Sequence, residues 1–318
     1  MSHRMKIFTA TAGRPLAELI CGRLLTKLGD SMVGRHNDGE IRVKFRDSVR
    51  GVEAFIIGPT CPPAENILEL CFLAAAAKES SAKRVTLVIP YLGYNRQDRK
   101  NEPRVPLSAR VVCRMLSDYA DRVLLFDLHS EPTAGFFKKH VRVDHLYASP
   151  VIVPYLKGII GDNYVVAAAD GGSSKRAGKY SDLLGSRNLV IFNKQRPEDG
   201  VVAEKGILII GDVAGKDVVF VDDMVDTAGT LCADAVAAKK AGAQRIFACA
   251  THALFSGKAL ERLDESPIDE LIITDTIPIP QEKLQGRRIK ITTLSVESLL
   301  ANAIRNLYDG KSVSALIP

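Results

Sequence analysis

Residues 218–230 read VVFVDDMVDTAGT, and this stretch decides the fold class. Its four leading apolar residues predict a buried strand that ends at Asp222 and Asp223. Residues 226–230 are mostly small or hydroxyl-bearing, and they lead into a predicted helix. A buried strand that turns directly into a helix is the building unit of a parallel sheet covered by helices. The sequence therefore predicts an α/β fold.

The turn after this strand has the composition of an anion-binding loop. Small residues let backbone N–H groups approach a ligand closely, and a helix N-terminus favours negative charge. The two threonines add hydroxyl donors, and the paired acids can accept hydrogen bonds from a sugar diol. We therefore predict a sugar phosphate site made by Asp222, Asp223, Asp226, Thr227, Ala228, Gly229 and Thr230. An ordinary capped strand–turn–helix is the alternative, and the double acid argues against it.

The rest of the chain repeats this alternation of strands and helices. Strands are expected at 6–10, 54–58, 84–90, 122–128, 164–169, 189–193, 217–222, 245–250, 270–274 and 289–292, and helices at 15–28, 62–78, 106–119, 175–184, 229–241, 258–263 and 296–307. This pattern predicts two similar α/β domains, each a mainly parallel sheet flanked by helices. We place the first domain at 1–147 and the second at 148–302, with the tail from about 303 to 318 packing on the first.

Length and composition fit this two-domain interpretation. The chain has 318 residues, which is two domains at roughly 100–200 residues each. Hydrophobic residues make up 46% and charged residues 25%, so a disordered or fibrous protein is excluded. The net charge of +6 is small and spread along the chain. It favours a small anionic ligand and gives no sign of a nucleic-acid-binding arm.

The sequence shows no sign of export or membrane insertion. No apolar run approaches the ~20 residues that a membrane-spanning helix needs. The first residues, MSHRMKIFTATAGRP, lack the apolar core of a signal peptide. The six cysteines lie far apart without a CxxC pair, which predicts reduced thiols and excludes a typical zinc site. We therefore expect a cytoplasmic protein without a membrane partner.

Nucleotide phosphates would have to be held without a glycine-rich loop. The chain lacks GxGxxG, and its Gly-Lys-Ser at 310–312 has Arg305 where a P-loop requires glycine. Residues 94–100 (YNRQDRK) follow a predicted strand and supply Arg96, Arg99 and Lys100. Guanidinium groups at the carboxyl end of a strand suit a polyphosphate. From these residues alone, a solvated charged loop is an equal alternative.

Six segments together resemble one enzyme family. Residues 218–230 resemble the phosphoribosyl-diphosphate binding signature of the type I phosphoribosyltransferase fold. Salvage transferases, regulators and ribose-phosphate diphosphokinases share that signature. The other five segments are similar to ribose-phosphate diphosphokinases in order and spacing: NDGE at 37–40, YNRQDR at 94–99, FDLH at 126–129, DGG at 170–172 and NKQR at 193–196. The resemblance covers nearly the whole chain.

This resemblance implies a reaction and a set of substrates. The family transfers the diphosphoryl group of ATP to the anomeric hydroxyl of ribose 5-phosphate, which gives phosphoribosyl diphosphate and AMP. A phosphoribosyltransferase is the first alternative, but it leaves YNRQDR and the N-terminal half unexplained. A non-catalytic regulatory subunit is the second alternative. It would be expected to lose a metal residue or the Lys/Arg pair, which this chain keeps.

The resemblance also assigns roles to residues. It implies that Mg²⁺ is bound by His129 and Asp170, and that Lys194 and Arg196 are catalytic cations on a flap formed with residues 197–205. From these residues alone, a solvated basic turn is the simpler interpretation. ATP contacts are implied for Asp38, Glu40, Arg96, Gln97, Asp98 and Arg99. The turn that holds Asp38 and Glu40 would reach the adenine from a neighbouring subunit. Family members commonly carry Phe where this chain has His36, and imidazole can also stack on a base.

Two further segments resemble regulatory regions of the family. Ser48 and Arg50, together with Ser312 and Ser314, are similar to segments that bind phosphate or ADP between subunits. A surface turn and a chain end are the plain alternatives. The resemblance also implies a homo-oligomer, a hexamer built from dimers.

Overall fold

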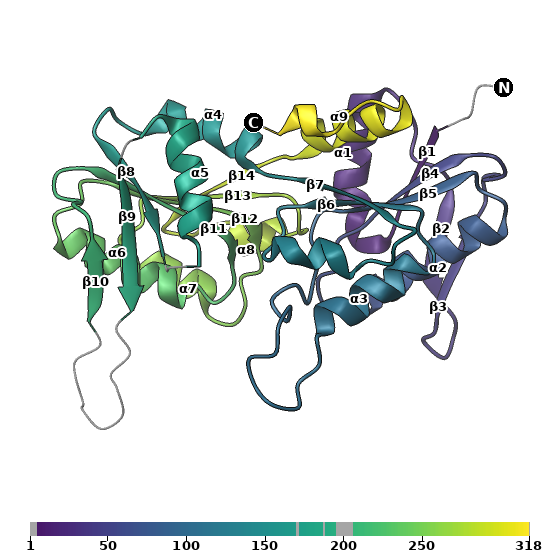
Figure 1. Ribbon diagram of the computed structural model, residues 1–318, viewed down its shortest axis with the longest axis horizontal. Helices are drawn as coiled ribbons and strands as arrows, with labels where there is room; N and C mark the ends of the chain where they lie inside the picture. The colour runs from purple at the N-terminus through teal and green to yellow at the C-terminus, as the bar shows by residue number, and fades with distance from the viewer. Residues whose placement is uncertain (1–4, 170–171, 187, 195–205, 318) are drawn as a thin grey trace. The chain divides into compact units, whose positions relative to one another are not determined.

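The computed structural model describes residues 5–169, 172–186, 188–194 and 206–317 (Figure 1). The chain divides into two compact units. Unit 1 consists of the described residues within Met1–Ala148, together with Thr276–Pro278 and Val296–Ile317. Unit 2 consists of those within Ser149–Asp275, together with Ile279–Ser295. Each unit is a mainly parallel sheet flanked by helices, so the predicted α/β class is confirmed.

Unit 1 is built on a five-stranded sheet in which every neighbouring pair is parallel. Its strands lie in the order β1 (Met5–Thr9), β4 (Glu53–Ile57), β5 (Arg84–Ile89), β6 (Arg122–Phe126) and β7 (Arg142–Leu146). The central strands are apolar runs buried on both faces, as expected for a sheet between helix layers. All five strands therefore end at one edge of the sheet.

Helices cover both faces of this sheet (Figure 1). On one face lie α2 (Glu65–Glu79) and α3 (Ser108–Ser117), whose apolar side chains share one core cluster with the sheet. On the other face, α1 (Arg14–Leu24) packs against α9 (Glu297–Tyr308), and Arg23 forms an ion pair with Glu297 at 2.7 Å. The C-terminal helix thus belongs to unit 1. The short 3₁₀ helices η1 (Thr11–Gly13), η2 (Glu131–Phe136) and η3 (Ser314–Leu316) complete the unit.

Unit 1 also contains elements that the sequence did not predict. An antiparallel hairpin of β2 (Ser31–Arg35) and β3 (Ile41–Phe45) lies beside α2, and Phe45 packs edge-on against Phe8 with ring centroids 4.6 Å apart. β7, which the sequence analysis did not expect, is an edge strand, and edge strands tolerate polar residues. Helix α1 stops at Leu24 rather than at residue 28 because Leu25 adopts a left-handed backbone, with φ of 53°.

Unit 2 is built on a seven-stranded sheet that is parallel except at one edge. The strands lie in the order β10 (Ile207–Ile210), β9 (Leu189–Lys194), β8 (Tyr164–Ala168), β11 (Asp217–Val225), β12 (Ile246–Ala253), β13 (Glu270–Thr274) and β14 (Lys290–Leu294). Only β10 runs antiparallel to its neighbour among these described strands. The helices are α4 (Ser149–Ile159), α5 (Ser174–Leu184), α6 (Gly229–Lys240), α7 (Ala259–Glu265) and α8 (Gln281–Leu284).

One sequence expectation for unit 2 was wrong. The strand expected at 217–222 continues to Val225, because Met224 and Val225 still pair with β12. Asp222 and Asp223 therefore lie within the strand rather than after it. Helix α4 begins unit 2 at Ser149, within the stretch 147–150 where the sequence analysis placed the domain break, and Pro150 and Pro154 are both accommodated in this helix.

All six cysteines lie within the described residues, and none forms a disulfide. Burial raises the pKa of the Cys113 thiol to about 12, which makes it a poor nucleophile at neutral pH.

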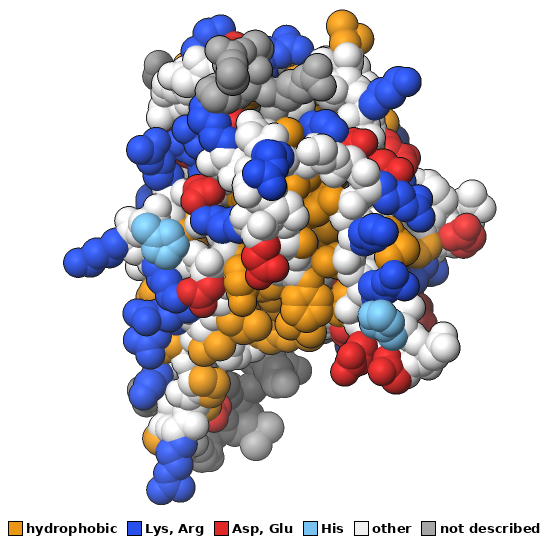
Figure 2. Space-filling view, turned by 90° about the vertical axis from the view of Figure 1, so that its right-hand side faces the viewer, with side chains coloured by type: hydrophobic (Ala, Val, Ile, Leu, Met, Phe, Trp, Pro, Cys, Tyr) orange, Lys and Arg blue, Asp and Glu red, His pale blue; other side chains and the backbone are white. Residues whose placement is uncertain are grey.

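No helix in the described part of the chain is long and apolar enough to cross a membrane. Figure 2 shows an area of surface hydrophobic side chains bordered by charged ones.

Candidate functional site

The strand order of unit 2 creates a natural binding position. From β8 the chain continues to β9 on one side, and it later returns through β11 on the other side of β8. Neighbouring loops therefore leave in opposite directions at the carboxyl ends of β8 and β11. In open parallel sheets this switch point is where ligands bind. The described strands of unit 1 follow each other in chain order and have no such point.

The loop from β11 to α6 lies at this switch point, where the sequence placed the sugar phosphate. Ala228 is buried and left-handed, with φ of 58°, and α6 begins at the next residue, Gly229. The carbonyl of Thr227 accepts a hydrogen bond of 2.8 Å from Arg262 of α7. A left-handed residue other than glycine costs on the order of 1 kcal/mol or more and persists where the surroundings impose it. The loop is therefore held in a set conformation.

The space beside Gly229 is not filled by protein atoms. A side-chain Cβ built there would meet no protein atom closer than 3.9 Å. Its backbone is not left-handed, so neither conformation nor packing requires glycine at this position. The missing side chain instead keeps the N-terminus of α6 accessible. A helix N-terminus with exposed N–H groups suits a phosphate.

Asp222 and Asp223 lie beside this loop near the end of β11. Asp223 is 5% exposed and Asp222 is half-buried, and the backbone N–H of Asp223 donates a 2.8 Å hydrogen bond to Asp222 Oδ1. Burial and the neighbouring Asp223 raise the pKa of Asp222 to about 8, against a weaker opposing effect of Arg176. Two carboxylates this close favour a shared proton, a cation or hydroxyl donors.

In unit 1, two predicted site segments meet at the carboxyl edge of the sheet. The loop between β5 and α3, residues 90–107, holds Arg96, Gln97, Asp98 and Arg99, and it projects from the unit in Figure 1. Ser130, directly after His129, donates a 2.6 Å hydrogen bond to Asp98 Oδ2. This hydrogen bond joins the predicted ATP loop to the segment that contains His129, the predicted metal ligand.

Most of the predicted site side chains in these two segments are exposed to solvent. Arg96, Gln97, Arg99 and His129 are exposed, while Asp98 is half-buried. Arg99 Nε lies 3.4 Å from Asp98 Oδ1. Exposed guanidinium groups at a strand end can form paired hydrogen bonds with phosphate oxygens.

The turn that holds Asp38 and Glu40 is not brought to this loop. It forms the tip of the β2–β3 hairpin, and Figure 1 shows it apart from the loop between β5 and α3. Asp38 Oδ1 accepts the N–H of Glu40 at 3.0 Å, and Arg35 donates to the carbonyl of Gly39 at 2.9 Å. The tip is exposed on all sides, as the β-turn interpretation of its sequence predicts.

Several predicted site residues lie outside the described part of the chain. Asp170 and Arg196 are among them, and the side chain of Lys194 is likewise not described, although its backbone ends β9. Within the described residues, no three His, Cys, Asp or Glu side chains form a cluster suited to a metal ion. The predicted metal and catalytic pairs therefore remain predictions.

The predicted regulatory residues occupy two exposed turns of unit 1. Ser48 and Arg50 flank the buried Val49 in the turn before β4. Ser312 and Ser314 lie around the start of η3, where the hydroxyl of Ser312 accepts the N–H of Ser314 at 3.1 Å.

Strained backbone marks the same strand ends. Seven described residues other than glycine have positive φ, and five of them follow the carboxyl ends of strands: Tyr94, Arg104, Asp127, Ala228 and Phe255. Asp127 is also buried, and its Oδ2 accepts the N–H of Ala148 at 3.1 Å. Such strain clusters at binding sites, where neighbouring structure maintains it.

Sequence reasoning missed Arg262 and Ser130, which hold the two loops. Arg262 reaches the loop of Thr227 from 35 residues further along the chain, and Ser130 reaches Asp98 across 32 residues. Neither residue belongs to a recognisable motif. Only the packing of parallel strands brings them to these loops.

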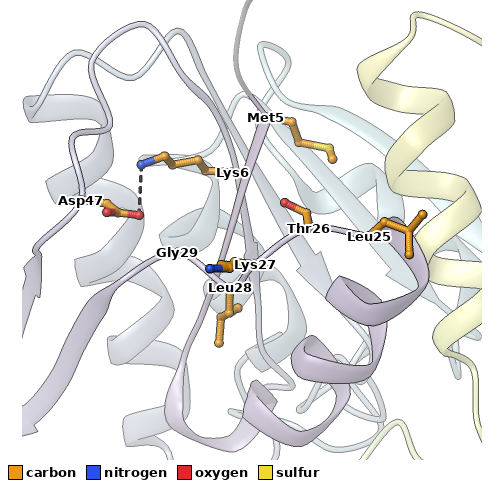
Figure 3. Close-up of a pocket in the computed structure, with 8 residues that line it drawn as sticks. All are labelled: Met5, Lys6, Leu25, Thr26, Lys27, Leu28, Gly29 and Asp47. Atoms are coloured by element: carbon orange, nitrogen blue, oxygen red, sulfur yellow. Dashed lines mark ion pairs between the residues drawn. The ribbon is translucent and has the colours of Figure 1, made fainter.

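A cavity of about 480 Å³ lies away from these strand ends (Figure 3). Met5 and Lys6 at the start of β1 contribute to it, along with the segment from Leu25 to Gly29. Lys6 is already paired with Asp47 at 3.0 Å. The cavity therefore lies at the amino end of the sheet of unit 1, opposite the edge that carries the loop between β5 and α3.

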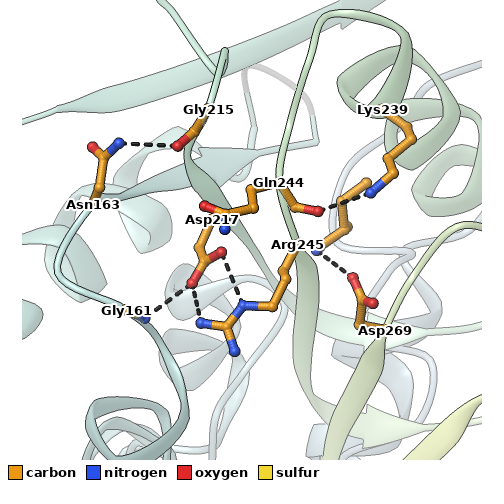
Figure 4. A network of polar contacts seen from close by, with 9 residues as sticks. Gly161, Asn163, Gly215, Asp217, Lys239, Gln244, Arg245 and Asp269 are labelled. Atoms are coloured by element: carbon orange, nitrogen blue, oxygen red, sulfur yellow. Dashed lines mark hydrogen bonds and ion pairs between the residues drawn. The ribbon is translucent and has the colours of Figure 1, made fainter.

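A polar network occupies the amino ends of the strands in unit 2 (Figure 4). Buried Asp217 accepts hydrogen bonds from the N–H of Gly161 at 2.9 Å and from Arg245 Nε at 3.1 Å. Asp269 accepts the N–H of Ile246 at 2.7 Å. These contacts join the starts of neighbouring strands, so their role is structural.

Comparison with known proteins covers the whole chain. Residues 5–119 match the model of the N-terminal domain of ribose phosphate pyrophosphokinase, and residues 190–318 match that of the phosphoribosyl synthetase-associated domain. The ribose-phosphate pyrophosphokinases of Shewanella oneidensis and Pasteurella multocida are 46% and 45% identical to it, each over 98% of both chains. The crystal structure of phosphoribosylpyrophosphate synthetase from Mycobacterium smegmatis matches with a TM-score of 0.88 and 34% identity, over 96% of this chain and 99% of that one.

Proposed function

The chain belongs to the ribose-phosphate pyrophosphokinase family, and we propose that it transfers the diphosphoryl group of ATP to ribose 5-phosphate in an Mg²⁺-dependent reaction. The products are phosphoribosyl diphosphate and AMP, for use in nucleotide synthesis. The observation that carries this proposal is the pair Asp222 and Asp223 beside the open loop at the switch point of unit 2.

Ribose 5-phosphate binds in unit 2 in this proposal. Its phosphate accepts hydrogen bonds from the loop 226–230 and faces the N-terminus of α6, where the helix dipole favours negative charge. The ring hydroxyls donate to Asp222 and Asp223. The high pKa of Asp222 supports this, because hydroxyl donors or a cation would relieve the repulsion between the two carboxylates.

ATP binds through unit 1 in this proposal. Arg96 and Arg99 pair with its phosphates, while Gln97 and Asp98 hold the loop. Asp38 and Glu40 contact adenine from a neighbouring copy of the chain. The hairpin position supports that arrangement, because the tip lies apart from the ATP loop of its own unit. The proposed assembly is a homo-oligomer, a hexamer by resemblance to the family.

The residues proposed for Mg²⁺ are His129 and Asp170, and Asp222 and Asp223 add contacts through water in this proposal. Oxygen-rich donors suit this cation, and the charge repulsion at Asp222 is what a bound cation would relieve. When bound, Mg²⁺ would neutralise charge on the transferred phosphates. Lys194 and Arg196 supply further positive charge at the reacting phosphorus.

The reaction follows from these placements. The C1 hydroxyl oxygen of ribose 5-phosphate attacks the β-phosphorus of ATP, and the bond from that phosphorus to the oxygen of AMP breaks. The hydroxyl proton is released, and AMP leaves with the bridging oxygen. Positioning and charge stabilisation dominate such transfers, so the chain needs cations and fixed loops more than a covalent catalyst.

Ser48, Arg50, Ser312 and Ser314 form the proposed anion-responsive segments of unit 1. All four are exposed polar residues, which suits phosphate or ADP as the effector. Phosphate titration of the activity, with an Arg50→Ala variant as comparison, tests this assignment. An identical phosphate response in both proteins would contradict it.

Label transfer tests the proposed reaction. The protein is incubated with Mg²⁺, ribose 5-phosphate and ATP labelled with ³²P at the β-phosphate. We expect the label in a sugar diphosphate and unlabelled AMP in equal amount. Labelled ADP, or AMP release that does not depend on the sugar, would contradict the reaction. A phosphoribosyltransferase would instead consume phosphoribosyl diphosphate when given a nucleobase.

A further inference from the structure

The loop between β5 and α3 is tied to three different segments by hydroxyl groups. Thr60 lies after β4, Ser108 begins α3, and Ser130 follows β6. None of the three belongs to the motifs that identify the family resemblance. Each makes a hydrogen bond of 2.7 Å or less with a residue of the loop.

Thr60 fixes the start of the loop. Its hydroxyl accepts the N–H of Gly93 at 2.7 Å and donates to the carbonyl of Tyr91 at 3.2 Å. Thr60 is only 1% exposed, so these bonds form away from water. A Cβ at Gly93 would lie 2.2 Å from the carbonyl oxygen of Thr60, so this close approach requires glycine. The left-handed Tyr94, with φ of 62°, follows directly.

Ser108 fixes the middle of the loop to the first turn of α3. Its hydroxyl donates to Oε1 of Gln97 at 2.5 Å, and the N–H of Ala109 donates to the carbonyl of Gln97 at 3.3 Å. Helix N-termini carry N–H groups without partners inside the helix. Gln97 therefore satisfies one of them, and its side-chain oxygen is committed to the protein.

Ser130 fixes the carboxylate of Asp98. The hydroxyl donates to Oδ2 at 2.6 Å, while Oδ1 faces Nε of Arg99 at 3.4 Å. A hydroxyl bond to a carboxylate is about twice as strong as one between neutral groups. Both oxygens of Asp98 are thus engaged within unit 1. These contacts suit Asp98 to orienting Arg99.

We propose that Thr60, Ser108 and Ser130 are positioning residues for nucleotide binding. Their hydroxyl groups set the backbone of the loop, so Arg96 and Arg99 face solvent in a fixed arrangement before ATP arrives. The ordering cost of the loop is then met during folding and not during binding. Ser130 also couples the loop to the segment of His129. This inference rests on the proposed function for the identity of the nucleotide.

Three variants test the proposal: Thr60→Val, Ser108→Ala and Ser130→Ala. Each should raise the Kd for Mg²⁺-ATP, measured by calorimetry without the sugar, about five- to tenfold. The KM for ribose 5-phosphate should stay within twofold. Ser130→Thr and Thr60→Ser keep a hydroxyl and should restore most of the affinity. An unchanged Kd in a folded Ser130→Ala protein would overturn the proposal.

Ser117 supplies a matched control within the same unit. It is fully buried, and its hydroxyl donates to the carbonyl of Cys113 at 2.6 Å and accepts the N–H of Lys138 at 3.0 Å. Ser117→Ala should lower Tm and leave the Kd for ATP unchanged. An equal rise in Kd in this variant would mean that general destabilisation, rather than loop positioning, explains the effect.

A double-mutant cycle tests whether Ser130 acts through Asp98. Asp98→Ala and Ser130→Ala should each weaken ATP binding, and the double variant should be no weaker than Asp98→Ala alone. Additive losses would contradict the coupling. Because binding is measured apart from turnover, failure of label transfer in the wild-type protein would refute the proposed reaction without deciding the role of these hydroxyl groups.

Discussion

Asp222 and Asp223 are the residues on which the chemistry of unit 2 depends. The sequence identified both, together with the loop that follows, because an acid pair beside small residues is an unusual pattern. It could not show that β11 continues to Val225, since strand length depends on pairing with β12. The extension places Asp222 in a half-buried position and raises its pKa to about 8. Burial, rather than residue type, therefore sets its protonation.

Stability should depend on pH through Asp222. Burial and Asp223 raise its pKa to about 8 in the folded state, from 3.8. The unfolded chain thus releases this proton at lower pH, and the free energy of unfolding should fall between about pH 4 and 8 as pH rises. The slope approaches ~1.4 kcal/mol per pH unit for one proton. Urea titrations at pH 5 and at pH 8 measure this difference in the free energy of unfolding.

Asp222→Asn should flatten this dependence and raise the stability at pH 8. The control is Asp212→Asn at the surface, where Lys216 lowers the pKa of the carboxyl. That variant should leave the slope between pH 5 and 8 as it is. An unchanged slope in Asp222→Asn would mean that this carboxyl is ionised throughout.

Gly229→Val should weaken ribose 5-phosphate binding without unfolding unit 2. The nearest protein atom to an added Cβ is 3.9 Å away, so the new side chain would occupy ligand space. We expect a KM for the sugar phosphate at least tenfold higher, with Tm within about 2 °C of the wild type.

The comparison variant is Gly158→Val in α4, where an added Cβ has similar space and meets nothing within 4 Å outside its own helix. Gly158→Val should change neither the KM for ribose 5-phosphate nor the KM for ATP. If Gly229→Val left the sugar KM unaltered, the phosphate would have to bind elsewhere.

At the scale of elements, buried strands were predictable and partly exposed ones were not. The runs that form β5, β6 and β13 are mostly apolar, and the structure places them within two residues of the expected bounds. The β2–β3 hairpin alternates Ile41, Val43 and Phe45 with exposed charged residues. That pattern indicates a half-buried strand, but the runs are short. The edge strand β7 was also not predictable. It tolerates polar residues because one of its sides has no neighbouring strand.

Asp217→Ala should destabilise unit 2 without changing its chemistry. It would leave the N–H of Gly161 without its protein acceptor and remove the partner of Arg245. Because Arg245 is 44% exposed, water compensates for part of the loss. We expect a loss of roughly 2 kcal/mol in urea unfolding.

Turnover per folded molecule should be normal in Asp217→Ala, because the network lies at the amino ends of the strands. Asp217→Asn keeps an acceptor and should lose less stability. A variant that folds stably but turns over slowly would show that the two ends of the sheet are coupled.

At the scale of the whole molecule, one fold class supports two different binding edges. Unit 2 reverses its strand order and places its loop at the reversal, whereas the described strands of unit 1 run in chain order. Unit 1 instead presents a long loop held by contacts from distant segments. The sequence predicted both loops from their motifs. It could not predict the contacts of Thr60 or Ser130, because these depend on which strands become neighbours.

The exposed apolar side chains of unit 1 should be covered in an assembly. Leu68 and Phe72 on α2, with Val111 and Met115 on α3, are 37% to 52% exposed, and the two helices pack together. Such an exposed apolar group is typical of an interface. If copies of the chain associate there, Val111→Glu and Met115→Glu should lower the mass in sedimentation equilibrium.

Leu208→Glu on the edge strand β10 is the matched control, since Leu208 is 45% exposed in unit 2. It should leave the mass unchanged. An unchanged mass in the α3 variants would place the interface on another surface.

The central claim is that the loop 226–230 of unit 2 holds the phosphate of a pentose phosphate. A crystal structure of the protein with ribose 5-phosphate tests it most directly. We predict phosphate oxygens within hydrogen-bond distance of the backbone N–H groups of Thr227 to Thr230, with the ring hydroxyls facing Asp222 and Asp223. An empty loop with the sugar phosphate bound elsewhere, for example beside Lys6 and Lys27, would contradict the claim.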